Sequence, residues 1–404
     1  MPHPFLKGYD ENTYTSRYPD IASAIADGKL ASGEEHYLKF GRHEGRRALR
    51  DFDEKWYIQT YPQADADIKS GLVKTPFAHF QSIGRFRGYL ATPQAPRERN
   101  PSGYHSSFGG LWTDLGNAMD IVRGKAELGL ITDEQAEQLT HWIRDGYVVI
   151  PAAIGDDGLD AVCGEFEAAF NAPQKKFLFE CQAVKAGAIP WNEKLTTSAS
   201  KGLDFHWFSE NYRNLIFAPK IRQFMDLVFE RPPLATQSLS FYLGSSQRAH
   251  QDWAYVTYTL PTQFLASWTA LEDVTPPAGE LFYHPGSHRL DEFLFDGAHK
   301  SPHEAKRTNP GYSGKDDAQA YVDQLERRCE ALGMWRRTFL PKRGDTLIWS
   351  AELVHGGNPI TAGHTRKSIV AHYCPREVAP LYFESRPRQI KRHEKNSYYT
   401  TAIY

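Results

Sequence analysis

The N-terminal part of this 404-residue chain is an internal duplication, and this feature limits the possible fold more than any other. Residues 9–50 align with residues 52–93 without a gap. Identical residues pair along the whole alignment: Asp10/Asp53, Glu11/Glu54, Tyr14/Tyr57, Tyr18/Tyr61, Pro19/Pro62, Ile25/Ile68, Gly28/Gly71, His36/His79, Gly41/Gly84, Arg42/Arg85 and Gly45/Gly88. So many matches at one constant offset indicate two copies of one small unit, and residues 1–93 are predicted to be a separate domain.

Each copy is predicted to consist of short helices. In the first copy Asp10 is a suitable N-cap, and Pro19 stands where the first helix has to end. A second helix would end near Gly28, and a third would cover residues 34–40. The same signals recur in the second copy, where the third helix is expected at 77–83. Because two copies are fewer than a stable solenoid needs, we expect them to pack on each other or on the next domain.

The duplicated block resembles a short repeat attached to some bacterial glycosyltransferases and to other surface-polysaccharide or exported proteins. The resemblance covers residues 8–93. It implies no catalytic residue, so we interpret the block as a docking module for a protein partner. His36 and His79 are interpreted as packed histidines rather than ligands.

The composition is that of an ordinary globular protein. Hydrophobic residues make up 41%, charged residues 24%, and the net charge is -2. This charge balance gives no indication of nucleic-acid binding. The four cysteines show no CxxC spacing and are predicted to be reduced thiols. The N-terminus shows no apolar leader, and no run of about 18 apolar residues occurs, so we expect no transmembrane segment and a cytoplasmic location.

A second domain is predicted at residues 111–380, after a Pro- and Gly-rich linker at 94–110. Residues 381–404 are predicted to be a basic C-terminal tail, and its basic run at 386–395 is expected to be solvated rather than to bind an anionic partner. Helices are expected in the second domain at 111–128, from a capping box at Thr132–Gln135 to Gly146, at 159–170, at 221–229 and at 317–332.

The strand-like segments of the second domain are separated by long insertions. They are expected at 147–150, 238–243, 256–258, 264–270, 346–349 and 367–373. Such strands without a regularly repeating helix favour a jelly roll, that is, a double-stranded β-helix. The predicted fold class is therefore α+β: a jelly-roll core with flanking helices, preceded by a small all-α domain of two repeats. A jelly roll brings together strands that are far apart in the sequence.

His250-Gln251-Asp252 is a candidate metal-binding stretch. Residues two apart point to the same face of an extended backbone, so His250 and Asp252 could hold one ion from one side. His355 is the candidate third ligand, because the jelly roll would bring it beside the other two. Two histidines and one carboxylate on one face of a metal are typical of non-haem Fe(II) oxygenases. The His-x-Asp pair alone is a weak signal, since it also occurs often by chance.

From about residue 130 to about residue 378 the chain resembles the phytanoyl-CoA dioxygenase family of Fe(II)- and 2-oxoglutarate-dependent oxygenases. Five motifs in the same order carry the resemblance: His250-Gln251-Asp252, Trp268, Pro285-Gly286-Ser287-His288, Gly344-Asp345-Thr346 before His355, and Arg366. The resemblance implies an enzyme that uses Fe(II), 2-oxoglutarate and O2, with His250, Asp252 and His355 as the iron ligands.

The same resemblance assigns residues to the co-substrate. Arg366 would bind the distal carboxylate of 2-oxoglutarate, for which its planar, always-charged fork is suited. Trp268 would form a wall of the co-substrate site, and Lys201 would approach it. Gly357 departs from the family pattern, because some members have a serine there that donates one hydrogen bond to 2-oxoglutarate.

The implied reaction is hydroxylation of an unactivated C–H, with release of succinate and CO2. Related halogenases lack the ligating carboxylate, so Asp252 favours hydroxylation. The expected substrate is a small molecule or a glycan-related compound, and the N-terminal repeats favour the glycan. An acyl-CoA, an amino acid or a small natural product stays open.

Two alternatives were weighed against this hypothesis. The first is a non-catalytic binding or scaffold protein built on a degenerate jelly roll, and the complete set of three candidate ligands with Arg366 argues against it. The second is a jelly-roll metalloenzyme that does not use 2-oxoglutarate, and Arg366 together with Trp268 argues against that.

Overall fold

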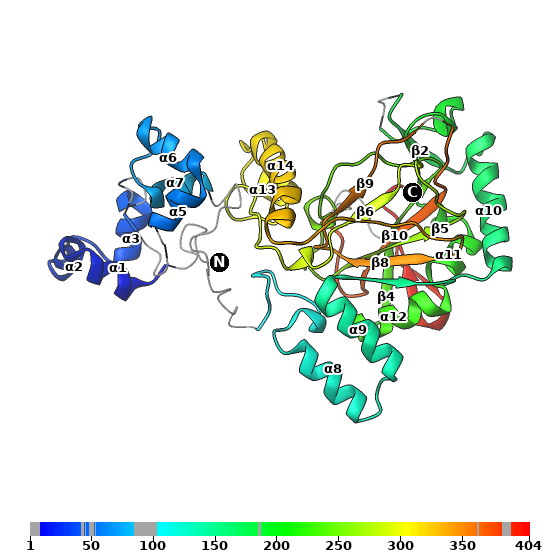
Figure 1. The fold of residues 1–404 in the computed structure, drawn as a ribbon, viewed down its shortest axis with the longest axis horizontal. Coiled ribbons are helices and arrows are strands. Elements are labelled where there is room, and N and C mark those ends of the chain that lie inside the picture. The colour runs from blue at the N-terminus through cyan, green and yellow to red at the C-terminus, as the bar shows by residue number, and fades with distance from the viewer. Residues whose placement is uncertain are drawn as a thin grey trace. The chain divides into compact units, whose positions relative to one another are not determined.

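Figure 1 shows a computed structural model of the chain, which describes residues 9–41, 44, 46–47, 52, 54–84, 103–184, 187–361, 363–381 and 389–404. The chain forms two compact units. The first consists of Met1–Glu98 with Asp291–Gln324, and the second of Arg99–Leu290 with Leu325–Tyr404. The larger part of the predicted linker, residues 94–102, lies outside the described residues.

In the first unit the duplicated residues form short helices around a buried aromatic cluster. The first copy contains α1 (Glu11–Arg17), α2 (Pro19–Ala26), α3 (Gly33–His36) and a π-helical turn (Tyr37–Gly41), and the second contains α5 (Glu54–Thr60), α6 (Pro62–Lys69) and α7 (Pro76–Ser82). Asp10 caps α1 by accepting a hydrogen bond from the Thr13 amide, whereas Asp53 lies outside the described residues.

One buried contact is repeated in the two copies. The Tyr14 hydroxyl lies 3.0 Å from His36 Nδ1, and the Tyr57 hydroxyl lies 2.9 Å from His79 Nδ1. All four side chains are buried, so both histidines are packed against tyrosines, as the sequence predicted. Helices α13 (Pro302–Thr308) and α14 (Lys315–Ala331) come from the long insertion of the second half of the chain.

The second unit is built on two sheets. The large sheet has the strand order β1-β8-β5-β10-β4-β12-β11, with β2 and β3 attached beside β4, and the small sheet has the order β7-β6-β9. The strands are β1 (Tyr147–Ile150), β2 (Leu178–Cys181), β3 (Ser200–Leu203), β4 (Pro233–Phe241), β5 (Leu265–Ala270), β6 (Leu281–Tyr283), β7 (Arg337–Thr338), β8 (Thr346–Ser350), β9 (His355–Gly357), β10 (Ser368–Pro375), β11 (Lys391–His393) and β12 (Ser397–Tyr399).

The two sheets share one apolar core. Trp268, Leu347 and Val370 of the large sheet pack in one cluster with Leu281 and Tyr283 of the small sheet. Trp268 stands opposite Val370 and Leu347 in the strand register, so these side chains lie on the inner face. The predicted jelly roll and the α+β fold class are therefore confirmed.

Helices cover the other face of the large sheet (Figure 1). They are α9 (Asp133–Asp145), α10 (Asp156–Asn171), α11 (Glu210–Ile216) and α12 (Pro219–Phe229), and α8 (Ala118–Glu127) packs on α9. The predicted capping box is present at the start of α9, where Thr132 and Gln135 bond each other's backbone amides. Gly146 ends this helix with a φ of 79°, a conformation that a glycine adopts without strain.

Three predictions of local structure differ from the observed fold. Residues 256–258 form no strand. The helix expected over 111–128 is a short 3-10 turn at Trp112–Asp114 followed by α8. The residues expected to form a basic tail instead contribute β11 and β12 to the large sheet, where Tyr398 pairs with Leu234 in a parallel ladder. Residues 382–388 of that segment lie outside the described residues.

The tail is ordered because it meets the hydrogen-bonding needs of buried groups. Asp204 is fully buried, and one of its carboxylate oxygens accepts hydrogen bonds from Thr401 Oγ1 at 2.7 Å and from the Ala402 amide at 3.1 Å. His206 lies 2.8 Å from the Thr400 carbonyl through Nε2. Lys391, Arg392 and Lys395 of the basic run are exposed, as expected, whereas Ser397, Tyr399 and Thr400 after that run are buried.

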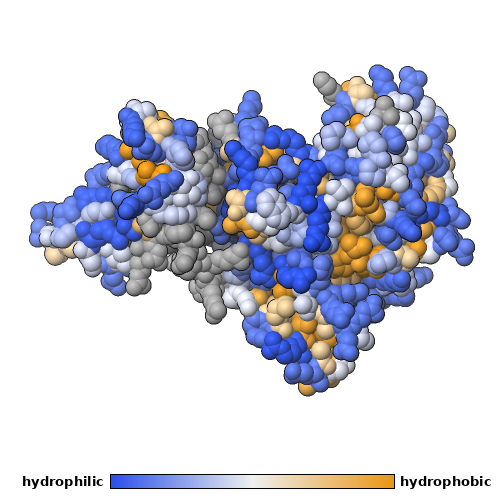
Figure 2. All heavy atoms as spheres, in the orientation of Figure 1, coloured by the Kyte–Doolittle hydropathy of each residue, from blue (hydrophilic) through white to orange (hydrophobic). Residues whose placement is uncertain are grey.

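The surface in Figure 2 is largely hydrophilic, with apolar residues exposed around α8. Met119, Leu128 and Leu130 have exposed fractions of 44%, 76% and 68%. In the part of the chain that the structure describes, no helix is long and apolar enough to cross a lipid bilayer.

Candidate metal centre

His250, Asp252 and His355 meet in the second unit. One potential ligand atom of each lies within 4.8 Å of the others, and each residue is 6% exposed. The backbones of His250 and His355 form a two-way bridge, in which each amide donates to the other's carbonyl at 2.9 Å. Asp252 begins a short 3-10 turn (Asp252–Ala254), so only the first half of the predicted extended stretch is strand-like.

The hydrogen bonds of the two histidines define their tautomers. His250 Nδ1 lies 2.8 Å from the Arg248 carbonyl, and His355 Nδ1 lies 3.0 Å from the Leu353 carbonyl. Because a carbonyl can only accept, each Nδ1 carries the proton and each Nε2 keeps its lone pair. Both Nε2 atoms lie 3.6 Å from Asp252 Oδ1. This arrangement presents two imidazole nitrogens and one carboxylate oxygen to a common point.

Burial and mutual charge set the protonation of this group. Burial lowers the pKa of His355 to about 4, so its Nε2 is neutral near pH 7. Burial would raise the pKa of Asp252, but the neighbouring histidines outweigh it and hold that pKa well below its ordinary value. The carboxylate is therefore ionised and His355 Nε2 is unprotonated, as coordination of a divalent metal requires.

Two further residues that the sequence did not single out for this site lie against the Asp252 carboxylate. Trp349 Nε1 donates to Asp252 Oδ2 at 2.9 Å, which leaves Oδ1 directed at the histidines. His372 Nε2 lies 3.8 Å from the same Oδ2, and its Nδ1 lies 3.1 Å from Gln237 Oε1. The alternation along β8 and β10 could have indicated that both side chains face inward, but not that they meet Asp252.

Arg366 is buried deeper in the barrel. It is 2% exposed, its Nη1 donates to the Gly279 carbonyl at 2.8 Å, and its guanidinium carbon lies 5.5 Å from the centre of the Trp268 ring. Burial lowers its pKa to about 10 while the charge of Glu280 opposes that shift, so the guanidinium is still charged near pH 7.

Polar atoms around Arg366 are buried without hydrogen-bond partners. They are Arg366 Nε, Trp268 Nε1 and Ser368 Oγ. A buried donor without a partner costs roughly 1–3 kcal/mol, so natural proteins seldom keep a cluster of them without a ligand. A carboxylate would satisfy these donors, and the residues therefore fit the distal end of 2-oxoglutarate, as the donor set of the histidines and Asp252 fits Fe(II).

Lys201 is placed differently from the other candidates. It lies on β3, opposite Glu180 of β2, and its Nζ lies 2.9 Å from Glu180 Oε2. The Lys201 side chain is 35% exposed. Of the residues predicted for the co-substrate, Lys201 therefore has an anionic partner within the protein, whereas Arg366 and Trp268 have unsatisfied donors.

Gly357, where some members of the resembled family have a serine, has no room for that side chain. A Cβ atom built on Gly357 would lie 2.7 Å from Ser245 Oγ. Gly357 pairs with Leu281, which faces the shared core, so this position also faces inward. The Ser245 hydroxyl thus occupies the space that a serine at 357 would need.

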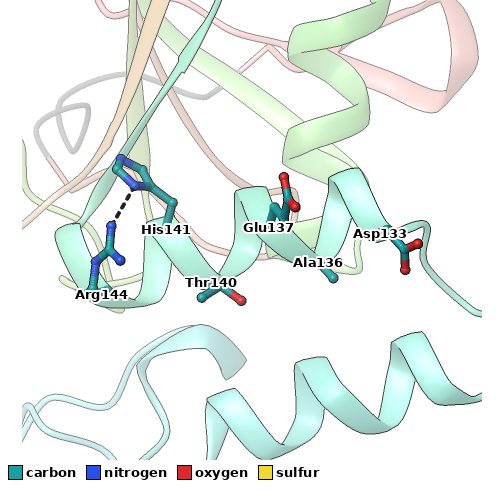
Figure 3. Close-up of a pocket in the computed structure, with 6 residues that line it drawn as sticks. All are labelled: Asp133, Ala136, Glu137, Thr140, His141 and Arg144. Atoms are coloured by element: carbon teal, nitrogen blue, oxygen red, sulfur yellow. Dashed lines mark hydrogen bonds between the residues drawn. The ribbon is translucent and has the colours of Figure 1, made fainter.

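A separate hollow lies along α9 and is not part of this centre. Figure 3 shows the residues of that helix that line the hollow: Asp133, Ala136, Glu137, Thr140, His141 and Arg144. Arg144 Nη2 lies 3.1 Å from His141 Nδ1 there. The hollow is open and contains none of the candidate ligands.

A family model described as phytanoyl-CoA dioxygenase (PhyH) matches residues 142–368, which is more than half of the chain and contains all three candidate ligands and Arg366. The chain belongs to the phytanoyl-CoA dioxygenase family. Phytanoyl-CoA dioxygenase, peroxisomal, from Rattus norvegicus is 22% identical over 256 residues, which cover 59% of this chain and 67% of the rat protein.

Solved structures with a similar fold include two that are described with iron or 2-oxoglutarate. The non-heme alpha ketoglutarate dependent epimerase SnoN from nogalamycin biosynthesis is 18% identical over 61% of this chain and 83% of SnoN, with a TM-score of 0.44. EctD from S. alaskensis with bound Fe is 18% identical over 61% of this chain and 77% of EctD, with a TM-score of 0.43.

Membership of the phytanoyl-CoA dioxygenase family establishes the class of chemistry. The protein is an enzyme of the Fe(II)- and 2-oxoglutarate-dependent oxygenases, and its cofactors are Fe(II), 2-oxoglutarate and O2. The prediction of the enzyme class made from the sequence is confirmed.

Proposed function

We propose that this phytanoyl-CoA dioxygenase family member hydroxylates an unactivated C–H of a small-molecule or glycan-related substrate and releases succinate and CO2. His250 Nε2, His355 Nε2 and Asp252 Oδ1 would hold the iron. The observation that carries the proposal is the convergence of these three atoms with both imidazoles in the Nε2-unprotonated tautomer. Iron would supply the site at which O2, the oxidant, reacts with 2-oxoglutarate, so that one oxygen atom goes to succinate and the other to the hydroxyl of the product.

The protein contributes binding, orientation and exclusion of water. Arg366 would bind the distal carboxylate of the co-substrate through two parallel hydrogen bonds, one from the buried Nε. The Trp268 ring lies against the guanidinium and closes the barrel interior around it. Trp349 keeps Oδ2 of Asp252 occupied, so that Oδ1 is presented to the metal. Three protein ligands leave positions open for co-substrate and oxygen.

The substrate is proposed to approach beside Tyr255. This residue follows the 3-10 turn that carries Asp252, its ring lies 5.7 Å from the His250 ring, and it is 52% exposed. An aromatic ring that touches a ligand on one side and solvent on the other forms part of the mouth of the site. The resemblance of the N-terminal repeats to those of polysaccharide-related proteins supports a glycan-related substrate.

The decisive experiment is carried out without oxygen. Fe(II) and 2-oxoglutarate added to the full chain should give the weak visible charge-transfer band of their chelate, and admission of air should give succinate. His355→Ala should abolish both signals, whereas His141→Ala, in the hollow along α9, should leave both unchanged. Absence of the band and of succinate with the wild-type protein contradicts the proposal.

The substrate class is tested by stimulation of succinate formation with glycans, nucleotide sugars and acyl-CoA esters. Tyr255→Ala should weaken stimulation by the true substrate while the slow, substrate-independent turnover continues. Equal stimulation of Tyr255→Ala and wild type would remove Tyr255 from the mouth of the site.

Location and partner form the last part of the proposal. No disulfide links any of the four cysteines, all of which lie among the described residues, and this supports a reducing compartment such as the cytoplasm. The repeats would bind a protein partner, and exposed apolar side chains of that unit, Phe40 at 50% and Leu72 at 66%, support this role. Fractionation of cells and affinity capture with the full chain test these two points.

A further inference from the structure

We infer that Glu280 is the resident counter-anion of Arg366 and thereby limits how tightly the enzyme binds 2-oxoglutarate. This inference rests on the proposed role of Arg366 in binding the distal carboxylate. Glu280 belongs to none of the motifs that carry the family resemblance, and no step of the proposed reaction uses it.

Glu280 lies immediately beside the contact that anchors Arg366. Arg366 Nη1 donates to the carbonyl of Gly279, the preceding residue, at 2.8 Å. Both side chains are buried, since Glu280 is 5% exposed and Arg366 is 2% exposed. The charge of Glu280 acts on the pKa of Arg366, and Arg366 Nε is buried without a hydrogen-bond partner, so this nitrogen stays available to a ligand.

The Glu280 carboxylate is held in place from both sides. Oε1 accepts from the Ala278 amide at 3.0 Å, and Oε2 accepts from Asn358 Nδ2 at 2.6 Å. The side-chain amide oxygen of Asn358, Oδ1, in turn accepts a hydrogen bond from Arg336, whose side chain is 41% exposed. Burial raises the pKa of Glu280, but the hydrogen bonds from Asn358 and the Ala278 amide outweigh it, and the charge of Arg366 adds a smaller lowering, so the pKa lies below its ordinary value.

Glu280 is singled out by its electrostatic effect on Arg366. Among the residues that the structure describes, Glu280 is the carboxylate whose charge acts on the pKa of Arg366. A buried cation is costly unless an anion compensates it. Without co-substrate, Glu280 supplies this compensation. When the distal carboxylate arrives, two anions share one guanidinium, and the repulsion between them weakens binding of 2-oxoglutarate.

Removing the charge of Glu280 should therefore destabilise the protein without co-substrate but strengthen its binding of 2-oxoglutarate. Glu280→Gln should destabilise the co-substrate-free protein, because Arg366 then lacks its counter-anion. The same variant should bind 2-oxoglutarate about fivefold more tightly or better, the size of an ordinary coupling between charged sites. Glu280→Asp keeps the charge and should stay within about twofold of the wild-type dissociation constant.

Glu272→Gln is the matched control. Glu272 accepts from the amide of Lys367, the residue after Arg366, at 2.9 Å, and its carboxylate lies 3.7 Å from Lys367 Nζ. The substitution removes one carboxylate charge beside Lys367, which is next to Arg366 in the sequence, but Glu272 is not a charge that acts on the pKa of Arg366. The Glu272→Gln variant should therefore keep the wild-type affinity for 2-oxoglutarate.

The test is titration calorimetry of the full chain with Mn(II) and 2-oxoglutarate, combined with thermal unfolding with and without 2-oxoglutarate. Tighter binding by Glu280→Gln, and a melting-temperature deficit that saturating 2-oxoglutarate closes, support the inference. Equal or weaker binding, or a deficit that persists at saturation, overturns it. If Glu280→Gln unfolds without ligand, the comparison at saturation alone decides. Wild-type protein that does not bind 2-oxoglutarate would overturn the proposed function as well, whereas normal wild-type binding confines the failure to Glu280.

Discussion

The hydrogen bond from Trp349 to Asp252 offers the sharpest test of the metal centre. Trp349→Phe keeps an aromatic ring but removes the Nε1–H that donates to Oδ2 at 2.9 Å. Both residues are buried, and the acceptor is an ionised carboxylate. A hydrogen bond to a buried charged group contributes about 1.5–3 kcal/mol, so the carboxylate should lose orientation and Oδ2 should be left unsatisfied.

The expected effect is on metal affinity more than on fold. Loss of a partner that orients a metal ligand typically weakens metal binding by about 10- to 100-fold, or about 1.4–2.8 kcal/mol. The dissociation constant for Mn(II) or anaerobic Fe(II), measured by calorimetry, reports this loss directly. Thermal unfolding of the metal-free protein separates it from a general loss of stability.

Trp142→Phe is the matched control. Trp142 is also a buried indole, 2% exposed, and its Nε1 donates at 3.2 Å to Thr113 Oγ1, which is a neutral acceptor remote from the metal ligands. Both variants should lose some stability, but only Trp349→Phe should lose metal affinity. Metal affinity of Trp349→Phe within about twofold of wild type, or an equal loss in Trp142→Phe, would refute the reasoning.

Three further outcomes are expected. Arg366→Lys should weaken 2-oxoglutarate binding by about 2–3 kcal/mol, measured by calorimetry with Mn(II), because a lysine cannot form the bidentate pair; unchanged affinity would contradict the assignment. Burial lowers the pKa of His288 in the folded protein to about 3, whereas in the unfolded chain it is about 6.5. Below about pH 6.5 the unfolded chain therefore takes up a proton that the folded protein does not, and the free energy of unfolding decreases as the pH falls. When the free energy of unfolding is measured in urea, the wild type should lose about 2 kcal/mol more than His288→Asn between about pH 7 and pH 5. An equal pH dependence of the free energy of unfolding in the two proteins would disprove this. Tyr57→Phe should cost about 1 kcal/mol of stability through its bond to His79, and an unchanged melting temperature would show that this contact is weak.

Local sequence signals predicted the elements whose stability is local. The capping box at Thr132 and the left-handed Gly146 at the two ends of α9 were read correctly, because both depend on bonds within a few residues. The prediction of a strand at residues 256–258 was wrong, because strand-favouring residues form a strand only when a neighbouring strand pairs with them. The prediction of a C-terminal tail was wrong for the converse reason. β12 pairs with β4 and so joins β11 to the large sheet, and composition cannot reveal this pairing.

By itself, the sequence determined the family, the jelly-roll class, the cofactors and the positions of the candidate ligands, because the order and spacing of these motifs are carried by the chain itself. Only the tertiary structure decided which side chains stand around them. The pairing of β5 with β8 and β10 brings Trp349 and His372 to Asp252, and the turn before β6 brings Glu280 to Arg366. Alternation along a strand shows which way a residue faces, whereas its neighbours depend on which strands hydrogen-bond to each other across long stretches of chain.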